Sequence, residues 1–324
     1  MSLADPNGPV DVSVLVPAKD EAENLPEFVR QCVMAFRNAP FRAELVVVDD
    51  GSRDETGAVL QRLSAEYPGF LRAARHRSRQ GIMEALNTGA LIARGDVFVF
   101  YPADLQFLPA EIPSLVQPIL DDAADLVTGA KQGIYEKAFV SGVYNGLCRR
   151  LFGVNATDLN SVKAYRREVT AVVPARPDWH RYIAVMAAVS GFRVTERPVT
   201  LHPRRAGKSK FGLGRIPVGV MDLLSVWFQV RFGRKPMLFF GVLGTLLFAV
   251  GFLAGLAALW IRVVYGVGFR PLLNLIETLV ISGIALFGFG FIGELLAGQR
   301  EEVRELHRAV RELAADRTRP TDIR

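Results

Sequence analysis

Apolar and polar positions follow a repeated pattern along the first third of the chain. Short, mostly apolar runs end in polar turns, and the turns lead into segments whose apolar residues recur at helical spacing. The runs predict buried strands at 12–16, 45–48, 71–74 and 97–101, and the helical spacing predicts helices at about 25–36, 54–67 and 81–93. This alternation predicts an α/β domain built on a parallel sheet with right-handed crossovers.

The second of these strands ends in two adjacent carboxylates. Asp49 and Asp50 close the apolar run 45–48 and open onto a glycine and Ser52. Ligands of open α/β sheets collect outside the carboxyl ends of the strands, so this pair suits nucleotide recognition. An ordinary helix cap is the alternative, because Ser52 and Glu55 have the spacing of a capping box. A helix cap at Ser52 would not explain why two aspartates precede it.

The strand at 97–101 also ends in oxygen ligands. After Pro102, Asp104 and Gln106 offer a carboxylate and an amide oxygen two residues apart. Hard cations such as Mg²⁺ and Mn²⁺ prefer such oxygens, and a cation held there would stabilise a diphosphate leaving group. A solvated loop acid is the alternative, and the carboxylates on the neighbouring strand end favour the functional interpretation.

The apolar excess of the chain is concentrated near its C-terminus. Residues 237–261 contain no charge across 25 positions, and as a helix they would extend roughly 37 Å, enough to cross a hydrocarbon layer of about 30 Å. A second apolar stretch, 272–297, has acids only near its ends, at Glu277 and Glu294. A buried hairpin in a soluble core is disfavoured by the short connection at 262–271, so we predict two membrane spans.

Flanking charges predict the orientation of these spans. Residues 1–10 lack the basic segment and apolar core of a secretory signal. Three cations precede the first span and seven arginines lie within 300–324, whereas the connecting loop has only Arg262 and Arg270. Because cytoplasmic segments are enriched in Lys and Arg, we expect an integral protein of the cytoplasmic membrane, with the large domain and both termini in the cytoplasm.

Cysteine count and net charge exclude other classes. The two cysteines, Cys32 and Cys148, are far apart and lack metal-ligand spacing, so neither a disulfide framework nor a zinc site is indicated. The net charge of +6 has no accompanying zinc-finger or RNA-recognition signature. Anionic lipid explains the basic charge better than nucleic acid, which we do not expect as a partner.

Several segments together resemble a known family. The segments VSVLVPAKDE (12–21), VVVDDGSRD (46–54), ARGD (93–96) and ADLQ (103–106) resemble the family 2 glycosyltransferases. Three later segments resemble polyisoprenyl-phosphate glycosyltransferases such as dolichol-phosphate mannose synthase: DLNS (158–161), KAYRRE (163–168) and RRAGKSKFG (204–212). The resemblance runs from about residue 11 to 300 and includes the apolar tail.

The resemblance implies a fold and a domain order. It implies a Rossmann-like GT-A catalytic domain, with a mostly parallel sheet, over residues 1–214. An interfacial amphipathic helix at 215–233 and a transmembrane hairpin at 236–298 would follow. Residues 299–324 would form an amphipathic cytoplasmic helix and tail, whose apolar spacing leaves lipid contact or pairing in a homo-oligomer open.

The same resemblance implies the donor site. The residues that would line the nucleotide pocket are Pro17, Ala18, Glu21, Asp49, Asp50 and Gly81. Asp104 and Gln106 would hold Mg²⁺ or Mn²⁺. Such enzymes usually have an acid where this chain has Pro102, so one expected metal ligand is absent and metal dependence becomes a question for this protein.

The acceptor site is expected to be cationic. A lipid phosphate is already anionic at neutral pH and needs positioning more than a strong base. The candidates are Lys131, Arg204, Lys208 and Lys210, with Ser209 as a hydrogen-bond donor. A solvated or headgroup-binding surface near the membrane is the alternative explanation for the lysines. Asp158 would orient one of these cations or contact the sugar; a helix cap or a structural ion pair is the alternative. His180 is interpreted as structural.

These observations lead to three hypotheses. The first is inverting transfer of a sugar from a nucleotide-sugar donor to a polyprenyl phosphate, dolichyl or undecaprenyl, at the cytoplasmic membrane face. The second is a degenerate sugar-nucleotide-binding membrane scaffold, which Pro102 favours. The third is a processive polysaccharide synthase, disfavoured because the chain lacks a Gln-x-x-Arg-Trp signature and further spans.

Overall fold

The chain forms two compact units, Met1–Arg215 and Ile216–Arg324. The computed structural model describes residues 8–132, 146, 148–154, 158–174, 176–203 and 216–317. The first unit contains the strands β1 (Val12–Ala18), β2 (Ala43–Asp49), β3 (Leu71–Arg75), β4 (Val97–Phe100), β5 (Leu126–Gln132), β6 (Lys163–Arg166) and β7 (Val194–Thr200). Its helices include α1 (Leu25–Phe36), α2 (Thr56–Glu66), α3 (Ile82–Ile92), α4 (Ile112–Leu120) and α6 (Ile183–Val189).

The strands form one mixed, mostly parallel sheet. Its order is β3-β2-β1-β4-β6-β5-β7. Strands β1 to β4 are mutually parallel, as the sequence predicts, and β5 and β7 are parallel to each other. Strand β6 runs antiparallel to both β4 and β5, with Lys163 opposite Phe100. The start of β6 therefore lies at the same edge of the sheet as the end of β4.

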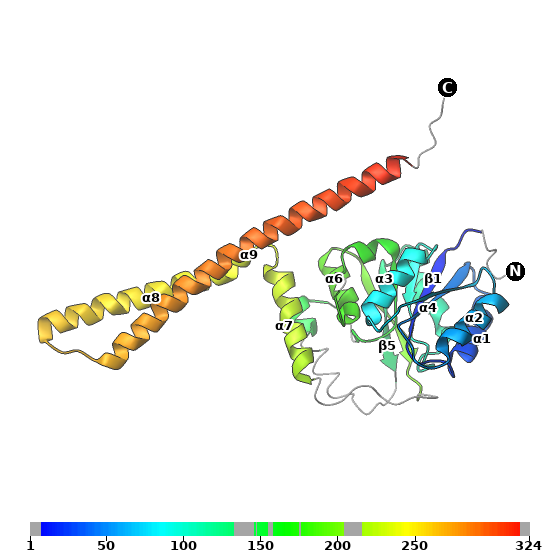
Figure 1. Ribbon diagram of the computed structural model, residues 1–324, viewed down its shortest axis with the longest axis horizontal. Coiled ribbons are helices and arrows are strands. Elements are labelled where there is room, and N and C mark those ends of the chain that lie inside the picture. Colours follow the sequence, from blue (N-terminus) through cyan, green and yellow to red (C-terminus); the bar gives the residue numbers. More distant parts are fainter. Residues whose placement is uncertain are drawn as a thin grey trace, which may run out of the picture. The chain divides into compact units, whose positions relative to one another are not determined.

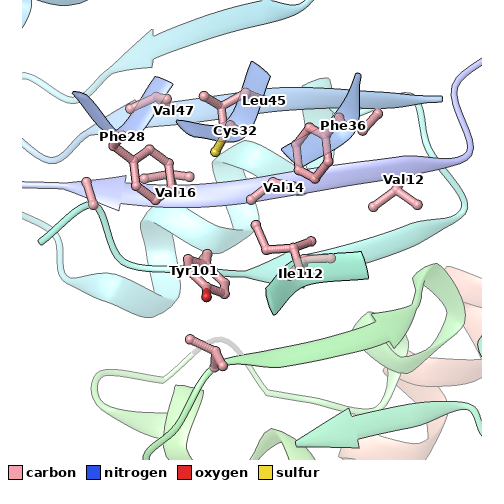
Figure 2. Close-up of a cluster of buried hydrophobic side chains, with 14 of the residues drawn as sticks. Val12, Val14, Val16, Phe28, Cys32, Phe36, Leu45, Val47, Tyr101 and Ile112 are labelled. Atoms are coloured by element: carbon pink, nitrogen blue, oxygen red, sulfur yellow. The ribbon is translucent and has the colours of Figure 1, made fainter. Parts of the chain in front are cut away.

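Helices pack on both faces of this sheet (Figure 1). On one face, Val12, Val14 and Val16 of β1 belong to the same buried cluster as Phe28 and Cys32 of α1, and Figure 2 labels these side chains in the cluster. The buried Cys32 is thus a packing residue. On the other face, α3 approaches closely enough at Gly89 that a Cβ there would lie 3.4 Å from Leu15.

A buried network secures the opposite end of the sheet from the candidate site. Glu44 is fully buried and accepts hydrogen bonds from Ser13 Oγ at 2.7 Å and from the backbone and side chain of Arg94 at 2.6 and 2.9 Å. A Cβ on Gly95 would lie 2.8 Å from the Ser13 backbone nitrogen, so the turn requires glycine. The ARGD segment at 93–96 therefore has a structural role in this fold.

The second unit contains three helices among the residues that the structure describes: α7 (Ile216–Phe232), α8 (Pro236–Tyr265) and α9 (Arg270–Arg317). Helices α8 and α9 run side by side (Figure 1). Each has a stretch long and apolar enough to cross a membrane. Helix α9 continues without interruption for 48 residues, so the predicted second span and the predicted C-terminal helix form one element.

Glycines allow the two long helices to touch backbone to backbone. A Cβ on Gly244 of α8 would lie 2.6 Å from the carbonyl oxygen of Gly283, and a Cβ on Gly283 would lie 2.6 Å from the backbone nitrogen of Phe248. Glu294 of α9 accepts a hydrogen bond of 3.2 Å from the backbone N–H of Met237 in the first turn of α8. A carboxylate is favourable at a helix N-terminus, which accounts for this acid in an apolar stretch.

Candidate active site

Four segments bring polar groups to one edge of the sheet. Strands β2 and β4 flank β1 and run parallel to it, so the loops that carry Asp50 and Asp104 leave the sheet at the same edge. Two strand spacings separate β2 from β4, roughly 10 Å across the sheet. The end of β5 at Lys131 and the loop before β6 at Asp158 lie at this edge as well.

The loops after β1 and β2 are joined by a ladder of hydrogen bonds. The backbone N–H groups of Asp20, Glu21 and Ala22 donate to Ser52 Oγ, Thr56 Oγ1 and Asp54 Oδ2 at 2.9, 2.9 and 3.2 Å. The capping box predicted as an alternative is not formed, because Ser52 bonds Asp20 and Glu55 itself occupies the N-cap of α2. These loops therefore hold one another in place before any ligand binds.

Asp49 and Asp50 point in different directions. The side chain of Asp49 is buried; its Oδ1 accepts the Ser52 N–H at 2.8 Å and its Oδ2 pairs with Arg75 Nε at 3.1 Å. The nucleotide contact of Asp49 stays a prediction, and the contacts that the structure gives its carboxylate are to the turn and to Arg75. Asp49 thus stabilises the turn that carries Asp50.

Asp50 organises the entrance to α3. Its Oδ1 accepts the Gln80 N–H at 2.7 Å and bonds His76 Nδ1 at 2.9 Å, while its Oδ2 accepts the Gly81 N–H at 2.8 Å. Burial raises the pKa of Asp50, but these hydrogen bonds outweigh burial and hold the pKa below its usual value. The backbone N–H of Asp50 donates to the carbonyl of Ala18 at 2.8 Å. Four of the predicted donor-site residues, Ala18, Asp49, Asp50 and Gly81, therefore lie together.

His76 belongs to this group and has no predicted role. Its Nε2 bonds Thr88 Oγ1 of α3 at 2.9 Å, so the imidazole links α3 to Asp50. Gly51 next to Asp50 has φ +68°, and a Cβ there would lie 2.6 Å from the Ser78 backbone. Only glycine allows this approach. A histidine with no spacing to other ligands gave no signal in the sequence. Pro17 and Glu21 lie partly exposed beside these loops.

The loop after β4 presents its polar side chains on one side. Ala103, Leu105 and Phe107 are buried, while the positions between them, Asp104 and Gln106, are partly exposed. Leu105 adopts a left-handed conformation, φ 56°, which its burial supports. Pro102 is partly exposed, as are Asp104 and Gln106. The proline offers no oxygen ligand beside these two side chains.

The donor set fits a divalent cation that is shared with a substrate. Within the described ranges, His, Cys, Asp and Glu side chains form no group of three or more that could hold a metal. One carboxylate and one amide oxygen suffice for Mg²⁺ when diphosphate oxygens and water complete the octahedron. Asp104 and Gln106 are suitably exposed for this purpose, whereas a permanent, all-protein site is not formed by these residues.

The loop after β4 is tied to the segment that follows β7. The His202 N–H donates to the Gln106 carbonyl at 2.8 Å. The predicted acceptor residues Arg204, Lys208, Ser209 and Lys210 follow in sequence, and they lie outside the described residues. The described part of the chain thus reaches the proposed metal ligand Gln106 at His202, two positions before Arg204 in the sequence.

Asp158 and Lys131 form an ion pair. Asp158 Oδ2 lies 2.9 Å from Lys131 Nζ, and Asp158 Oδ1 accepts the Asn160 N–H at 2.9 Å. Lys131 also donates to the Asn160 carbonyl at 3.2 Å. The geometry fits both the predicted orientation of a cation and the alternative of a structural ion pair, and in either case the cation is Lys131.

Lys163 and His180 are two buried titratable side chains near this pair. Lys163 has no exposed surface; burial lowers its pKa to about 7, the charge of Asp158 opposes this shift, and Lys131 and Arg181 add to it. Burial, with the charges of Lys163 and Arg181, lowers the pKa of His180 to about 3, and its ring packs edge-on against Phe100. A neutral, packed His180 agrees with its structural interpretation.

Comparison with known proteins establishes the family. Residues 13–157 match the family model described as glycosyl transferase family 2. Dodecaprenyl-phosphate galacturonate synthase from Rhizobium johnstonii is 32% identical over 302 residues, which are 90% of this chain and 89% of that protein. The chain belongs to glycosyl transferase family 2. The predicted family is therefore confirmed, and the protein is a glycosyltransferase.

Other relatives of this glycosyltransferase have similar names and lengths. An undecaprenyl-phosphate 4-deoxy-4-formamido-L-arabinose transferase from Pseudomonas paraeruginosa is 30% identical over 304 residues, 91% of this chain and 88% of that protein. One from Pseudomonas fluorescens is 29% identical over 299 residues, 90% of this chain and 86% of that protein. These relatives are polyprenyl-phosphate sugar transferases that match the chain through its apolar helices.

Solved structures confirm the predicted GT-A fold of this glycosyltransferase. Glucosyl-3-phosphoglycerate synthase from Mycobacterium tuberculosis, in complex with Mg²⁺ and uridine diphosphate, has a TM-score of 0.54 and 19% identity. The match covers 68% of this chain and 79% of the synthase. A complex of the same synthase with Mn²⁺, uridine diphosphate and glucosyl-3-phosphoglycerate has a TM-score of 0.52 and 20% identity over 68% and 80% of the two chains.

Proposed function

We propose that this glycosyltransferase moves a sugar from a nucleotide-sugar donor to a polyprenyl phosphate at the cytoplasmic face of a membrane. The observation that carries the proposal is the convergence of Asp50, Asp104 and the Asp158–Lys131 pair at one sheet edge, in a chain with two helices that can span a membrane. Relatives named for dodecaprenyl and undecaprenyl phosphate support the acceptor class.

The reaction is a displacement at the anomeric carbon. An oxygen of the lipid phosphate attacks this carbon as the bond to the nucleoside diphosphate breaks, and the configuration inverts. The attacking oxygen is already anionic, so catalysis depends on positioning and on stabilising the leaving group. Lys131, Arg204 and Lys210 supply positive charge and Ser209 a hydrogen bond to the acceptor phosphate.

The donor is held by the loops around Asp50. Asp50 fixes the Gln80 and Gly81 N–H groups, and Pro17, Ala18 and Glu21 complete the nucleotide pocket. Asp104 and Gln106 would hold Mg²⁺ or Mn²⁺ through their side-chain oxygens, and such a metal would neutralise charge on the diphosphate. Since Pro102 supplies no ligand, we expect the cation to bind together with the donor and weakly without it.

The membrane arrangement follows from the charge distribution. We place residues 1–214 and the tail at 299–324 in the cytoplasm, the amphipathic helix at 215–233 at the membrane interface, and the hairpin at 236–298 in the membrane. Arg231, Arg234 and Lys235 beside the first span and the arginines after the second support this orientation. Homo-oligomer formation through the end of α9 stays a prediction.

The second candidate is a scaffold that binds sugar nucleotides without turnover. Pro102 favours it, because the position that faces the metal site carries no acid. The two candidates differ in whether a lipid product forms, not in whether nucleotide binds.

The test is a transfer assay with the full-length protein. Radiolabelled UDP-galacturonate, UDP-4-deoxy-4-formamido-L-arabinose and UDP-glucose are each incubated with protein, Mn²⁺ and undecaprenyl phosphate. We expect label from one donor to enter an organic-extractable, mild-acid-labile product. Nucleotide binding with no product from any donor would favour the scaffold, and a polymeric product would favour a processive synthase.

A further inference from the structure

The described segment 158–162, which carries Asp158, is held at every residue. The carbonyl oxygens of residues 158–162 each accept a hydrogen bond. Lys163 Nζ donates to the carbonyls of Leu159 and Ser161, at 2.8 Å each. The carbonyl of Asp158 accepts from Thr128 Oγ1 at 3.1 Å, that of Asn160 from Lys131 Nζ at 3.2 Å, and that of Val162 from the Gly129 N–H at 2.9 Å. Side chains supply four of these five bonds.

Lys163 makes two of these bonds from inside the domain. It is the first residue of β6, and its side chain has no exposed surface. Its Nζ lies 5.8 Å from the centre of the Phe100 ring, within the range of a cation–π contact. The ammonium therefore holds the loop from the protein side, opposite the edge where substrate would bind.

The direction of the Asp158 carboxylate depends on this loop. Its Oδ1 accepts the Asn160 N–H, which closes a turn around Leu159, and Lys163 holds the carbonyl of Leu159 itself. Its Oδ2 pairs with Lys131, which is also bonded to the Asn160 carbonyl. A change in the turn would move both partners of the ion pair together.

We propose that Lys163 is a positioning residue: it fixes Asp158, and through it Lys131, by holding the Leu159 and Ser161 carbonyls. The consequence for transfer rests on the proposed function. A buried ammonium is costly, and an apolar side chain of similar length would pack at this position at lower cost. The lowered pKa of Lys163, caused first by burial, reflects that cost. The hydrogen bonds to the Leu159 and Ser161 carbonyls are the favourable interactions that a charged side chain makes here and an apolar one would not.

The test compares Lys163→Met with Tyr165→Phe in the full-length protein. Tyr165 lies two residues after Lys163 on the same strand, so both side chains are on the same face of the sheet. The Tyr165 ring contacts Phe98 of β4 edge-on, with 6.1 Å between ring centres, and the Lys163 ammonium contacts Phe100 of the same strand. In K163M we expect the Asn160 amide to exchange hydrogen at least about tenfold faster while the melting temperature is kept. Y165F should leave this exchange unchanged. Should K163M unfold, Lys163→Gln, a shorter neutral donor, replaces it.

Transfer kinetics then separate positioning from packing. With undecaprenyl phosphate and the donor that the wild-type protein uses, kcat of K163M should fall by about 100-fold with little change in the donor KM. In an Asp158→Asn background, K163M should lower kcat less than about twofold further, because the two residues act as a unit. Unchanged Asn160 exchange, an unchanged kcat, or a full additional loss in the Asp158→Asn background would overturn the proposal. If wild-type protein transfers no sugar, the proposed function fails, and the exchange measurement still decides whether Lys163 holds the loop.

Discussion

At the scale of single residues, neighbouring side chains at the sheet edge have different partners and different roles. Asp49 and Asp50 are both buried; Asp49 supports the turn, and Asp50 accepts three hydrogen bonds from the segment 76–81. After β4, Asp104 and Gln106 are partly exposed and Leu105 between them is buried. The partners of each side chain, and not burial alone, therefore distinguish these roles.

Asp50→Asn should weaken nucleotide binding. The amide replaces one acceptor oxygen by a donor that faces either His76 and Gln80 or Gly81, so the 76–81 segment loses its anchor. We expect calorimetry with UDP and Mn²⁺ to show at least about a tenfold higher Kd. Asp96→Asn, at an exposed position before β4, is the matched control and should keep the wild-type Kd. Equal Kd values for D50N and wild type would remove Asp50 from the donor site.

Pro102→Asp should strengthen metal binding. Position 102 is partly exposed and lies two residues before Asp104 in the same loop, so an acid there offers a third oxygen ligand. In a Mn²⁺ titration of P102D, we expect the Mn²⁺ concentration for half-maximal transfer to fall several-fold, because one charge-assisted ligand is added. Asp104→Asn should shift it in the opposite direction. An unaltered Mn²⁺ requirement in both variants would contradict the metal assignment.

At the scale of elements, the spacing of apolar residues in the sequence predicts β1 to β4 and α1 to α3. The same spacing does not predict β6 and β7. Strand β6 begins with a buried lysine, which breaks the apolar pattern, and β7 is an edge strand that contains Glu196, Arg197 and Pro198. The site residues divide in the same way, into those that follow an apolar pattern and those that do not. Asp50 and Asp104 could be predicted because they end apolar strands, whereas the roles of His76 and Lys163 depend on partners far away in sequence.

His180, in the short 3₁₀ helix η3 (Trp179–Tyr182), should make the protein less stable in acid. Its pKa is about 3 when folded and about 6.5 when unfolded, so the unfolded chain binds the proton first as the pH falls. This contribution to stability is complete above pH 6.5 and is lost between about pH 6.5 and 3. We expect the melting temperature of full-length protein to decrease over this range, and less steeply in His180→Gln. A slope that is identical in the variant would show that His180 does not titrate as described.

The contact between α8 and α9 should depend on individual glycines. At Gly283 a side chain would meet the backbone of α8, whereas at Gly288 of the same helix a Cβ would meet nothing within 4 Å. Gly283→Leu should therefore destabilise the hairpin by about 1–3 kcal/mol, measured as a lower melting temperature in detergent. Gly288→Leu should melt like the wild type. Equal melting of the two variants would exclude the close helix contact.

At the scale of the whole molecule, the chain joins a GT-A unit to a helical unit that can cross a membrane. Helix α9, with 48 residues, extends about 72 Å, more than twice a hydrocarbon layer of about 30 Å. Its charged end must therefore lie outside the bilayer. A lipid acceptor explains why one chain combines a nucleotide-sugar fold with an apolar hairpin.

The most direct test follows phosphorus in a reaction of purified full-length protein with undecaprenyl phosphate and its nucleotide-sugar donor. We predict that the ³¹P signal of the lipid phosphate monoester is replaced by that of a phosphodiester, with one nucleoside diphosphate released per sugar transferred and an inverted anomeric configuration. A lipid monoester that stays unchanged while the donor is consumed, or a sugar product without lipid phosphate, would contradict the account.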